Sequence, residues 1–315
     1  MVMPRVILPK IEHITLNLGF SSDGHGLELF PRHVPRTTEN LPGEISLIGY
    51  YSHKVSIPEC IVPSGRYVGC EDAAYLGNCL VALNKTVRAT SPMTGIPTLK
   101  PIPSIFRIDH EGRASQVAEM SGKLADQFCK GFTPLGHGLA LIRRIYDEKG
   151  KENPQILLCR WNGLNSGSLD LQPVDVFLQG DPKIGIGISA PPIDTPEGLV
   201  LVYHTIWDSK GGKCYQHFPI LLNKARPWEI IGISEAPIIT PAMFSSSCNC
   251  WVGGATYIRN LLYDYKRDLL YTIVTARDID NYWLEIPLTN ILRGMRNYRN
   301  AELTSSAFSF YINYF

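Results

Sequence analysis

The chain has 315 residues, of which 44% are hydrophobic, and its 30 Lys and Arg nearly balance 29 Asp and Glu. This composition is typical of a soluble globular protein and argues against disorder. No polybasic patch stands out, so neither nucleic acid nor an anionic membrane is expected as a partner. No apolar run approaches the ~20 residues that a bilayer-spanning helix needs.

The eight cysteines do not form a metal-binding pattern. None belongs to a CxxC pair, and Cys248 and Cys250 are too close in sequence for a relaxed disulfide with each other. The N-terminal stretch lacks the apolar region of a signal peptide. We therefore expect a cytoplasmic protein with reduced thiols, no metal and no cofactor. Disulfides remain open if the source is a hyperthermophile.

Short β runs separated by Gly, Pro, Asn and Asp dominate the chain. In chain order they fall at residues 44–52, 54–57, 75–84, 104–108, 138–146, 155–161, 199–203, 218–222, 251–257, 269–275 and 282–286. The run at 75–84 is expected to be a hairpin that turns at Gly77-Asn78. A single helix is predicted from Ser115 to Phe128, because Val117, Met120 and Leu124 have helical spacing.

The β runs indicate an all-β fold. The groups start every 30 to 70 residues or so, a spacing that overlaps the range of propeller blades. We predict one domain over residues 1–315, a β-propeller of about five blades. A pair of β-sandwiches is the alternative that the pattern alone leaves open.

The stretch from 181 to 226 contains the clearest strand. Residues 199–202 (LVLV) are apolar on both faces, so this strand is expected to lie inside the protein. It is predicted to end at Tyr203 and His204, which would place an imidazole at the rim of a sheet, where loops usually carry function. The simpler alternative is a core strand with a hydrogen-bonded histidine.

Acidic residues precede several of the predicted strands, in what read as turns. They are Glu71, Asp72, Asp194, Glu197, Asp264 and Asp268. Each is a candidate acid at the rim of a sheet. Each also has the simpler reading of a turn residue that hydrogen-bonds the backbone.

The segment GIGISAPPIDTPEGLVLVYHTI resembles the signature of glycoside hydrolase family 130, the mannoside phosphorylases and related hydrolases. The matching positions are Gly187, Pro191, Pro192, Ile193, Thr195, Gly198, Tyr203 and His204. Leu199 replaces the Trp of that signature, and Thr205 replaces its last Gly. Weaker similarities follow in the family's order, at residues 69–72 (GCED), 130–134 (KGFTP), 158–160 (LCR), and at Leu270, Tyr271 and Asp278.

The resemblance implies a five-bladed β-propeller with its active site in a central funnel. It implies inverting cleavage of β-mannosides or similar oligosaccharides, by phosphorolysis or hydrolysis, with inorganic phosphate as co-substrate in the first case. Asp72 matches the general acid, whose pKa the neighbouring Glu71 would help to raise. The implied substrate-binding residues are Glu71, Tyr203, His204, Trp207 and Asp278. The implied phosphate-binding residues are Lys130, Arg160, Arg107 and Arg113.

Three differences from the family's sequence favour a protein without catalytic activity. Ala73 and Ala74 replace the Pro-Arg that follows the acid in the family, and Cys159 replaces the His of its L-H-R segment. These changes leave open a catalytically inactive, sugar-binding or structural propeller. Glu197 and Glu235 are candidates for a second carboxylate by region only. The sequence also leaves a homo-oligomer open.

Overall fold

A computed structural model describes residues 5–6, 13–22, 27–35, 50–51, 55–56, 68–77, 80–90, 97–108, 114–147, 149–161, 167–209, 212–244, 255–258, 261–276 and 280–297. In the strands before residue 102 only the backbone is described. Nowhere in these ranges is a helix long and apolar enough to cross a membrane.

Strands within the described ranges form five sheets. The first contains β2 (His13–Ser22), β3 (Leu27–Pro35), β4 (Tyr50–Tyr51) and β5 (Val55–Ser56). The second contains β6 (Val68–Gly77), β7 (Leu80–Thr90), β8 (Pro97–Ile108), β9 (Ala114–Met120) and, parallel to β9, β13 (Ser168–Leu169). The third contains β10 (Lys130–Gly136), β11 (Leu139–Tyr146), β12 (Glu152–Trp161) and β14 (Leu171–Gln179).

The last two sheets share the C-terminal half of the chain. The fourth contains β15 (Gly185–Thr195), β16 (Gly198–Ser209), β17 (Gly212–Leu222), β18 (Ile230–Ser234) and β23 (Met295–Asn297). The fifth contains β19 (Thr256–Ile258), β20 (Leu262–Asp264), β21 (Leu269–Ala276), β22 (Asp280–Pro287) and the N-terminal β1 (Arg5–Val6). The helices are short: η1 (Lys123–Gln127), η2 (Pro241–Met243) and α1 (Leu288–Arg293).

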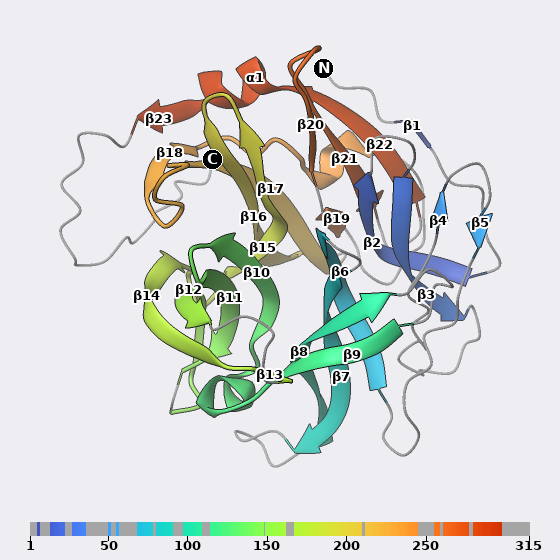
Figure 1. Ribbon diagram of the computed structural model, residues 1–315, viewed down its shortest axis with the longest axis vertical. Coiled ribbons are helices and arrows are strands. Elements are labelled where there is room, and N and C mark those ends of the chain that lie inside the picture. The colour runs from blue at the N-terminus through green and yellow to red at the C-terminus, as the bar shows by residue number, and fades with distance from the viewer. Residues whose placement is uncertain are drawn as a thin grey trace.

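The sheets follow one another around the molecule in chain order, as the colours of Figure 1 show. Apart from the N-terminal β1, the first strand of each sheet contacts the first strand of the next: β2 contacts β6, β6 contacts β10, β10 contacts β15, β15 contacts β19, and β19 contacts β2. The N-terminal strand β1 pairs with β22, the last long strand of the fifth sheet in the chain. The protein is thus all-β, with a β-propeller arrangement in which four blades are recognised.

The core lies between neighbouring sheets. Along β11, Ala140 and Ile142 pack toward the second sheet, whereas Leu141 packs toward the fourth. Along β16, Leu201 packs toward the third sheet, whereas Val200 and Val202 pack toward the fifth. Because both faces of these strands are covered, their sequences are apolar without alternation. The prediction that residues 199–202 form a buried strand is confirmed.

Two local predictions are wrong. The predicted helix at 115–128 is instead β9 followed by η1, and the two are separated by Gly122, whose φ of 79° breaks a right-handed helix. The strand predicted to end at His204 continues to Ser209, so His204 lies inside β16 and is only 6% exposed. By contrast, the hairpin predicted at residues 75–84 is confirmed, although Gly77, which was predicted to lie in the turn, is the last residue of β6 and pairs with Leu80.

Candidate functional site

A chain of buried polar side chains joins the fourth and fifth sheets. Ser189 Oγ lies 3.0 Å from His204 Nδ1 and 2.7 Å from His217 Nδ1. His217 Nε2 lies 2.9 Å from the backbone carbonyl of Thr256 and 3.1 Å from its hydroxyl. The hydroxyl of Thr256 in turn donates to the Tyr215 carbonyl. All four side chains are at most 6% exposed, so this polar network lies inside an otherwise apolar core.

Irregular pairing in β15 brings Ser189 into this network. Ile188 pairs with Tyr203 and Ala190 with Val202, so Ser189 is an extra residue, as in a β-bulge. A second irregularity lies between Ala190 and Ile193. It contains Pro191 and Pro192, which have no N–H to donate to a neighbouring strand and are therefore suited to such a position. The APPI segment thus re-aims the strand instead of continuing it regularly.

Gly187 makes room for the His204 ring. The two residues are paired across β15 and β16, and a Cβ on Gly187 would lie 2.6 Å from His204 Nε2. The same Cβ would lie 3.4 Å from Cδ of Arg143, which reaches over from β11. The Arg143 side chain and the His204 ring are therefore neighbours above Gly187. This places a guanidinium-bearing side chain beside the imidazole.

The network lies at one end of the ring of sheets. Lys130 begins β10 and pairs with Arg143, whose side chain contacts the beginning of β15. Thr256 begins β19 and contacts His217. The first strands of three neighbouring sheets therefore start close together. Of the residues predicted from the sequence, Lys130 and His204 are brought to this end.

Glu71 and Asp72 lie within β6, not in a turn before it. Glu71 pairs with Asn84 and Ala74 with Ala82, so Asp72 and Ala73 occupy a register irregularity on β6. Bulges are over-represented beside active sites, where they re-aim side chains. The side chains of Glu71 and Asp72, and all of Arg113 and Asp278, lie outside the described part of the structure, so their predicted roles remain predictions.

The two aromatic candidates differ in their surroundings. Tyr203 is 7% exposed and stacks on Phe218 in the core between the third and fourth sheets, with ring centroids 5.4 Å apart. It lies on the face of β16 opposite to His204. Trp207 is half-buried near the end of β16, where it pairs with Cys214. Tyr203 therefore packs as a core residue, while Trp207 is the more accessible of the two.

Arg160 and Arg107 are not brought close to Lys130 by the strand register. Arg160 pairs with Leu139, whereas Lys130 pairs with Arg143, four residues or roughly 13 Å further along β11. Arg107 pairs with Leu80 at the turn of the β6–β7 hairpin, away from Glu71. Both arginine side chains are exposed. Their predicted phosphate-binding roles stay predictions, at positions that are remote from the network.

Cys159, which replaces a histidine of the resembling segment, is a core residue. It is fully buried between the second and third sheets. Burial raises the pKa of its thiol to about 12, although the nearby Arg144 opposes this shift. The thiol is therefore neutral and unsuited to binding an anion.

No cluster of three potential metal ligands occurs among the residues described.

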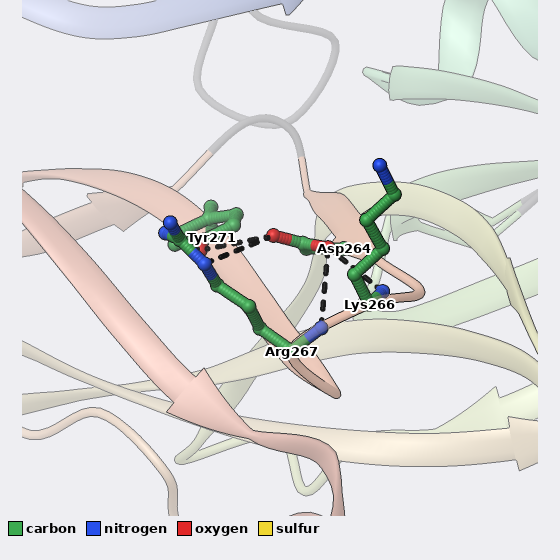
Figure 2. A network of polar contacts seen from close by, with 4 residues as sticks. All are labelled: Asp264, Lys266, Arg267 and Tyr271. Carbon is green, nitrogen blue, oxygen red and sulfur yellow. Dashed lines mark hydrogen bonds and ion pairs between the residues drawn. The ribbon is translucent and has the colours of Figure 1, made fainter.

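The acids predicted at residues 194, 197, 264 and 268 lie at the other ends of their strands. Asp264 accepts hydrogen bonds from the backbone N–H groups of Lys266 and Arg267, at 2.9 and 3.3 Å (Figure 2). Its second oxygen faces the Arg267 guanidinium and the Tyr271 hydroxyl. The backbone bonds and the Arg267 charge hold the pKa of Asp264 below its usual range. Asp264 is therefore a turn residue that hydrogen-bonds the backbone, which is the simpler of its two predicted roles.

Three residues of the network, Ser189, His217 and Thr256, were not predicted from the sequence, and neither was Arg143 beside it. Only His217 carries a local signal, because it directly precedes the apolar run Phe218–Leu222. The others have ordinary sequence surroundings. They gain their positions from a bulge, a cross-strand pair or a contact between sheets.

Comparison with known proteins found no matching family model and no matching curated protein. Solved structures do match. A β-1,2-mannobiose phosphorylase from Listeria innocua, in complex with β-1,2-mannobiose, is 16% identical with a TM-score of 0.60, covering 93% of this chain and 96% of its own. A glycosyl hydrolase from Bacteroides ovatus is 13% identical with a TM-score of 0.60, covering 89% and 86%.

A third match is a structure from work on the GH130 family of mannoside phosphorylases and its glycoside hydrolases that target β-1,2 mannosidic linkages in Candida mannan. It is 15% identical with a TM-score of 0.63, covering 89% of this chain and 86% of its own. At such low identities, likeness in structure establishes the fold. This chain has the fold of GH130 mannoside phosphorylases and glycoside hydrolases.

Proposed function

We propose that this protein is a glycoside-cleaving enzyme that acts on β-mannosides or similar oligosaccharides with inversion at the anomeric carbon. The observation that carries the proposal is the buried His204 network on a scaffold shared with a β-1,2-mannobiose phosphorylase. A buried polar network is stable only when each of its donors and acceptors has a hydrogen-bond partner. The network lies beside Arg143, which pairs with Lys130, so cationic residues adjoin it and suit a polar substrate.

The active site is placed at the end of the ring where the first strands begin. In this proposal the sheet of β2 to β5 supplies a fifth blade, residues 1–315 form one domain, and the site occupies a central funnel. Lys130 pairs with Arg143, whose side chain lies beside His204, and His217 of the same sheet as His204 contacts Thr256. These contacts support the placement because they join three sheets.

Asp72 is proposed as the general acid that protonates the departing glycosidic oxygen. The irregularity of β6 at Asp72 supports this role, since a bulge can turn the acid out of the regular strand pattern. Glu71, His204, Trp207 and Asp278 are proposed as sugar contacts, with Tyr203 packed behind them. A second carboxylate about 6.5 to 9.5 Å from the acid would be needed for hydrolysis with inversion.

Phosphate, where it is a co-substrate, is proposed to bind near Lys130 with Arg143 as its partner. A phosphate dianion needs several converging cations. The pairing of Lys130 with Arg143 supplies two such residues on adjacent strands. Arg107, Arg113 and Arg160 remain candidates from the sequence, with Arg107 and Arg160 displaced along their strands.

The proposal is tested by incubating the protein with β-1,2-mannobiose and other β-mannosides, with and without inorganic phosphate. Phosphate-dependent release of α-mannose 1-phosphate identifies a phosphorylase. Release of free mannose, first as the α-anomer, identifies an inverting hydrolase. Absence of product from a broad panel of glycans would contradict the proposed activity.

The role of Asp72 is tested with Asp72→Asn, for which we expect kcat to fall by about 10² to 10⁴ because protonation of the leaving group is lost. An aryl β-mannoside with a nitrophenolate leaving group needs little protonation, so the variant should lose much less activity on it. Asp170→Asn, which changes an exposed acid between β13 and β14, is the control. An equal loss on both substrates would contradict the acid role.

A further inference from the structure

The outer edge of the third sheet carries no further strand among the residues described. The four strands of this sheet lie in the order β10, β11, β12 and β14, so β14 is its outer strand (Figure 1). In three other sheets a strand from another part of the chain pairs at the corresponding place: β13 on β9, β23 on β18, and β1 on β22. The nine residues of β14 differ from these, because they end their sheet as an open edge.

The middle of this edge strand is exposed and partly apolar. Residues 172–176 are all exposed, without the alternation of a strand that has one covered face. Among them, Val174 is 51% exposed and Val176 is 42% exposed. β-Branched side chains favour strands, and an exposed apolar edge strand is a place where a second chain can pair. The strand therefore has the side chains of a pairing site.

The backbone of β14 is nevertheless poorly suited to accept another strand. Pro173 has no N–H to donate. The N–H of Val176 donates to Oδ1 of the preceding Asp175 at 2.7 Å, so this donor is used within β14. Val174 and Phe177 fall at the two register shifts of β14 against β12. Such irregularities twist an edge away from the regular ladder that an incoming strand needs.

The charge of this segment also opposes pairing between two copies. Residues 168–182 contain three Asp, at positions 170, 175 and 181, and no Lys, Arg or Glu. The segment therefore offers its own copy no opposite charge. Two copies that paired through β14 would bring carboxylates close to one another, and like charges on neighbouring strands are destabilising.

We propose that the chain keeps the outer edge of β14 from pairing with a second copy, and that Asp175 is the decisive residue. Its carboxylate accepts the Val176 N–H and places a negative charge in the middle of the edge. Natural sheets protect open edges with charged side chains, Pro and bulges, and β14 combines all three. Replacing Asp175 by an apolar β-branched residue should turn β14 into a surface for self-association. This role is independent of the proposed catalytic activity.

Self-association is measured by sedimentation velocity over a range of protein concentrations. Asp175→Val should associate at protein concentrations at least about tenfold lower than the wild type does, because each copy regains a backbone donor worth about one hydrogen bond. Asp170→Val makes the same change at an exposed acid just before β14 and should behave as the wild type. Association of Asp175→Val that is no stronger than that of Asp170→Val would overturn the proposal.

A second substitution locates the association on β14. Lysine on an edge strand prevents pairing, so Asp175→Val combined with Val176→Lys should return to the wild-type state of association. This recovery would also show that the chain folds without Asp175. The matched control combines Asp175→Val with Tyr265→Lys, because Tyr265 is 64% exposed but lies in the turn between β20 and β21. The control should still associate. Equal recovery with both lysines, or with neither, would refute the role of β14.

The hydrogen bond of Asp175 is tested by amide hydrogen exchange in dilute solution, where copies do not pair. The Val176 amide should exchange faster in Asp175→Ala than in the wild type, because its acceptor is removed. Asp170→Ala should leave this exchange rate unchanged. An unchanged rate at Val176 in Asp175→Ala would show that the carboxylate does not hold this donor, contrary to the proposal.

Discussion

Gly187 shows how one missing side chain shapes the candidate site. Its position on β15 opposite His204 leaves the space that the imidazole occupies, and Arg143 borders the same space. The resemblance in sequence singled out this glycine as part of a segment, without a reason for its identity. The structure supplies the reason, because any Cβ at this position would overlap the ring.

We expect Gly187→Ala to destabilise the protein by about 1 to 3 kcal/mol, since overpacking of a buried site forces neighbouring atoms to move. The displaced His204 ring should also show altered ¹⁵N resonances. Unfolding in urea measures the stability. Gly185→Ala is the matched control on the same strand, where the nearest atom would be 3.3 Å away and a smaller loss is expected. Equal losses in the two variants would show that the His204 contact is not the cause.

Some elements are determined by their local sequence, and others by pairing with a neighbouring strand. At residues 115–128 the apolar spacing is helical, but β8 pairs with Ala114 to Glu119, and Gly122 stops any helix. Between Ile188 and Ile193, two register irregularities let Ser189 hydrogen-bond His217 while the next residue, Ala190, packs toward the fifth sheet. The hairpin of β20 and β21 is instead determined locally, by Asp264 at its turn (Figure 2).

Asp264→Asn is expected to lower stability at neutral pH, because it keeps the acceptor oxygen but removes the charge that faces Arg267. The pKa of Asp264 is lowered in the folded protein, so its charge contributes stability above its ordinary pKa of 3.8. This contribution is lost as the pH falls through the lower folded-state pKa. The difference in unfolding free energy between wild type and variant should therefore be constant near neutrality and shrink at more acidic pH.

Urea unfolding at several pH values measures this difference. Asp264→Ala also removes the acceptor of the two backbone hydrogen bonds, so it should be the less stable of the two variants at neutral pH. A gap between wild type and Asp264→Asn that grows toward acidic pH would have the wrong sign for a lowered pKa and would refute the explanation.

At the scale of the whole molecule, the pairing of β1 with β22 joins the N-terminal part of the chain to its C-terminal part. Arg5 pairs with Trp283 and Val6 with Tyr282, so an N-terminal strand completes a sheet built from C-terminal strands. In Figure 1 the blue β1 accordingly lies beside the red β22. This pairing adds a strand from the start of the chain to the last sheet of the ring.

Deletion of residues 1–6 should lower the unfolding free energy by about 1 to 3 kcal/mol, because it removes the backbone hydrogen bonds of this pair and exposes the edge of β22. Deletion of residues 1–4, which stops before β1, is the control. The comparison is made by urea unfolding of the full-length and shortened chains. Identical stability of the two shortened chains would show that β1 does not contribute to closing the ring.

The sequence by itself determined the all-β class, most strand positions and the burial of residues 199–202, because turn residues and apolar runs are local features. It also pointed to His204. Only the tertiary structure decided that His204 lies within a strand and that Ser189, His217 and Thr256 are its partners. These contacts depend on a bulge, on register and on the packing of one sheet against the next. Such relations join residues far apart in the chain, and the periodicity of a single strand does not encode them.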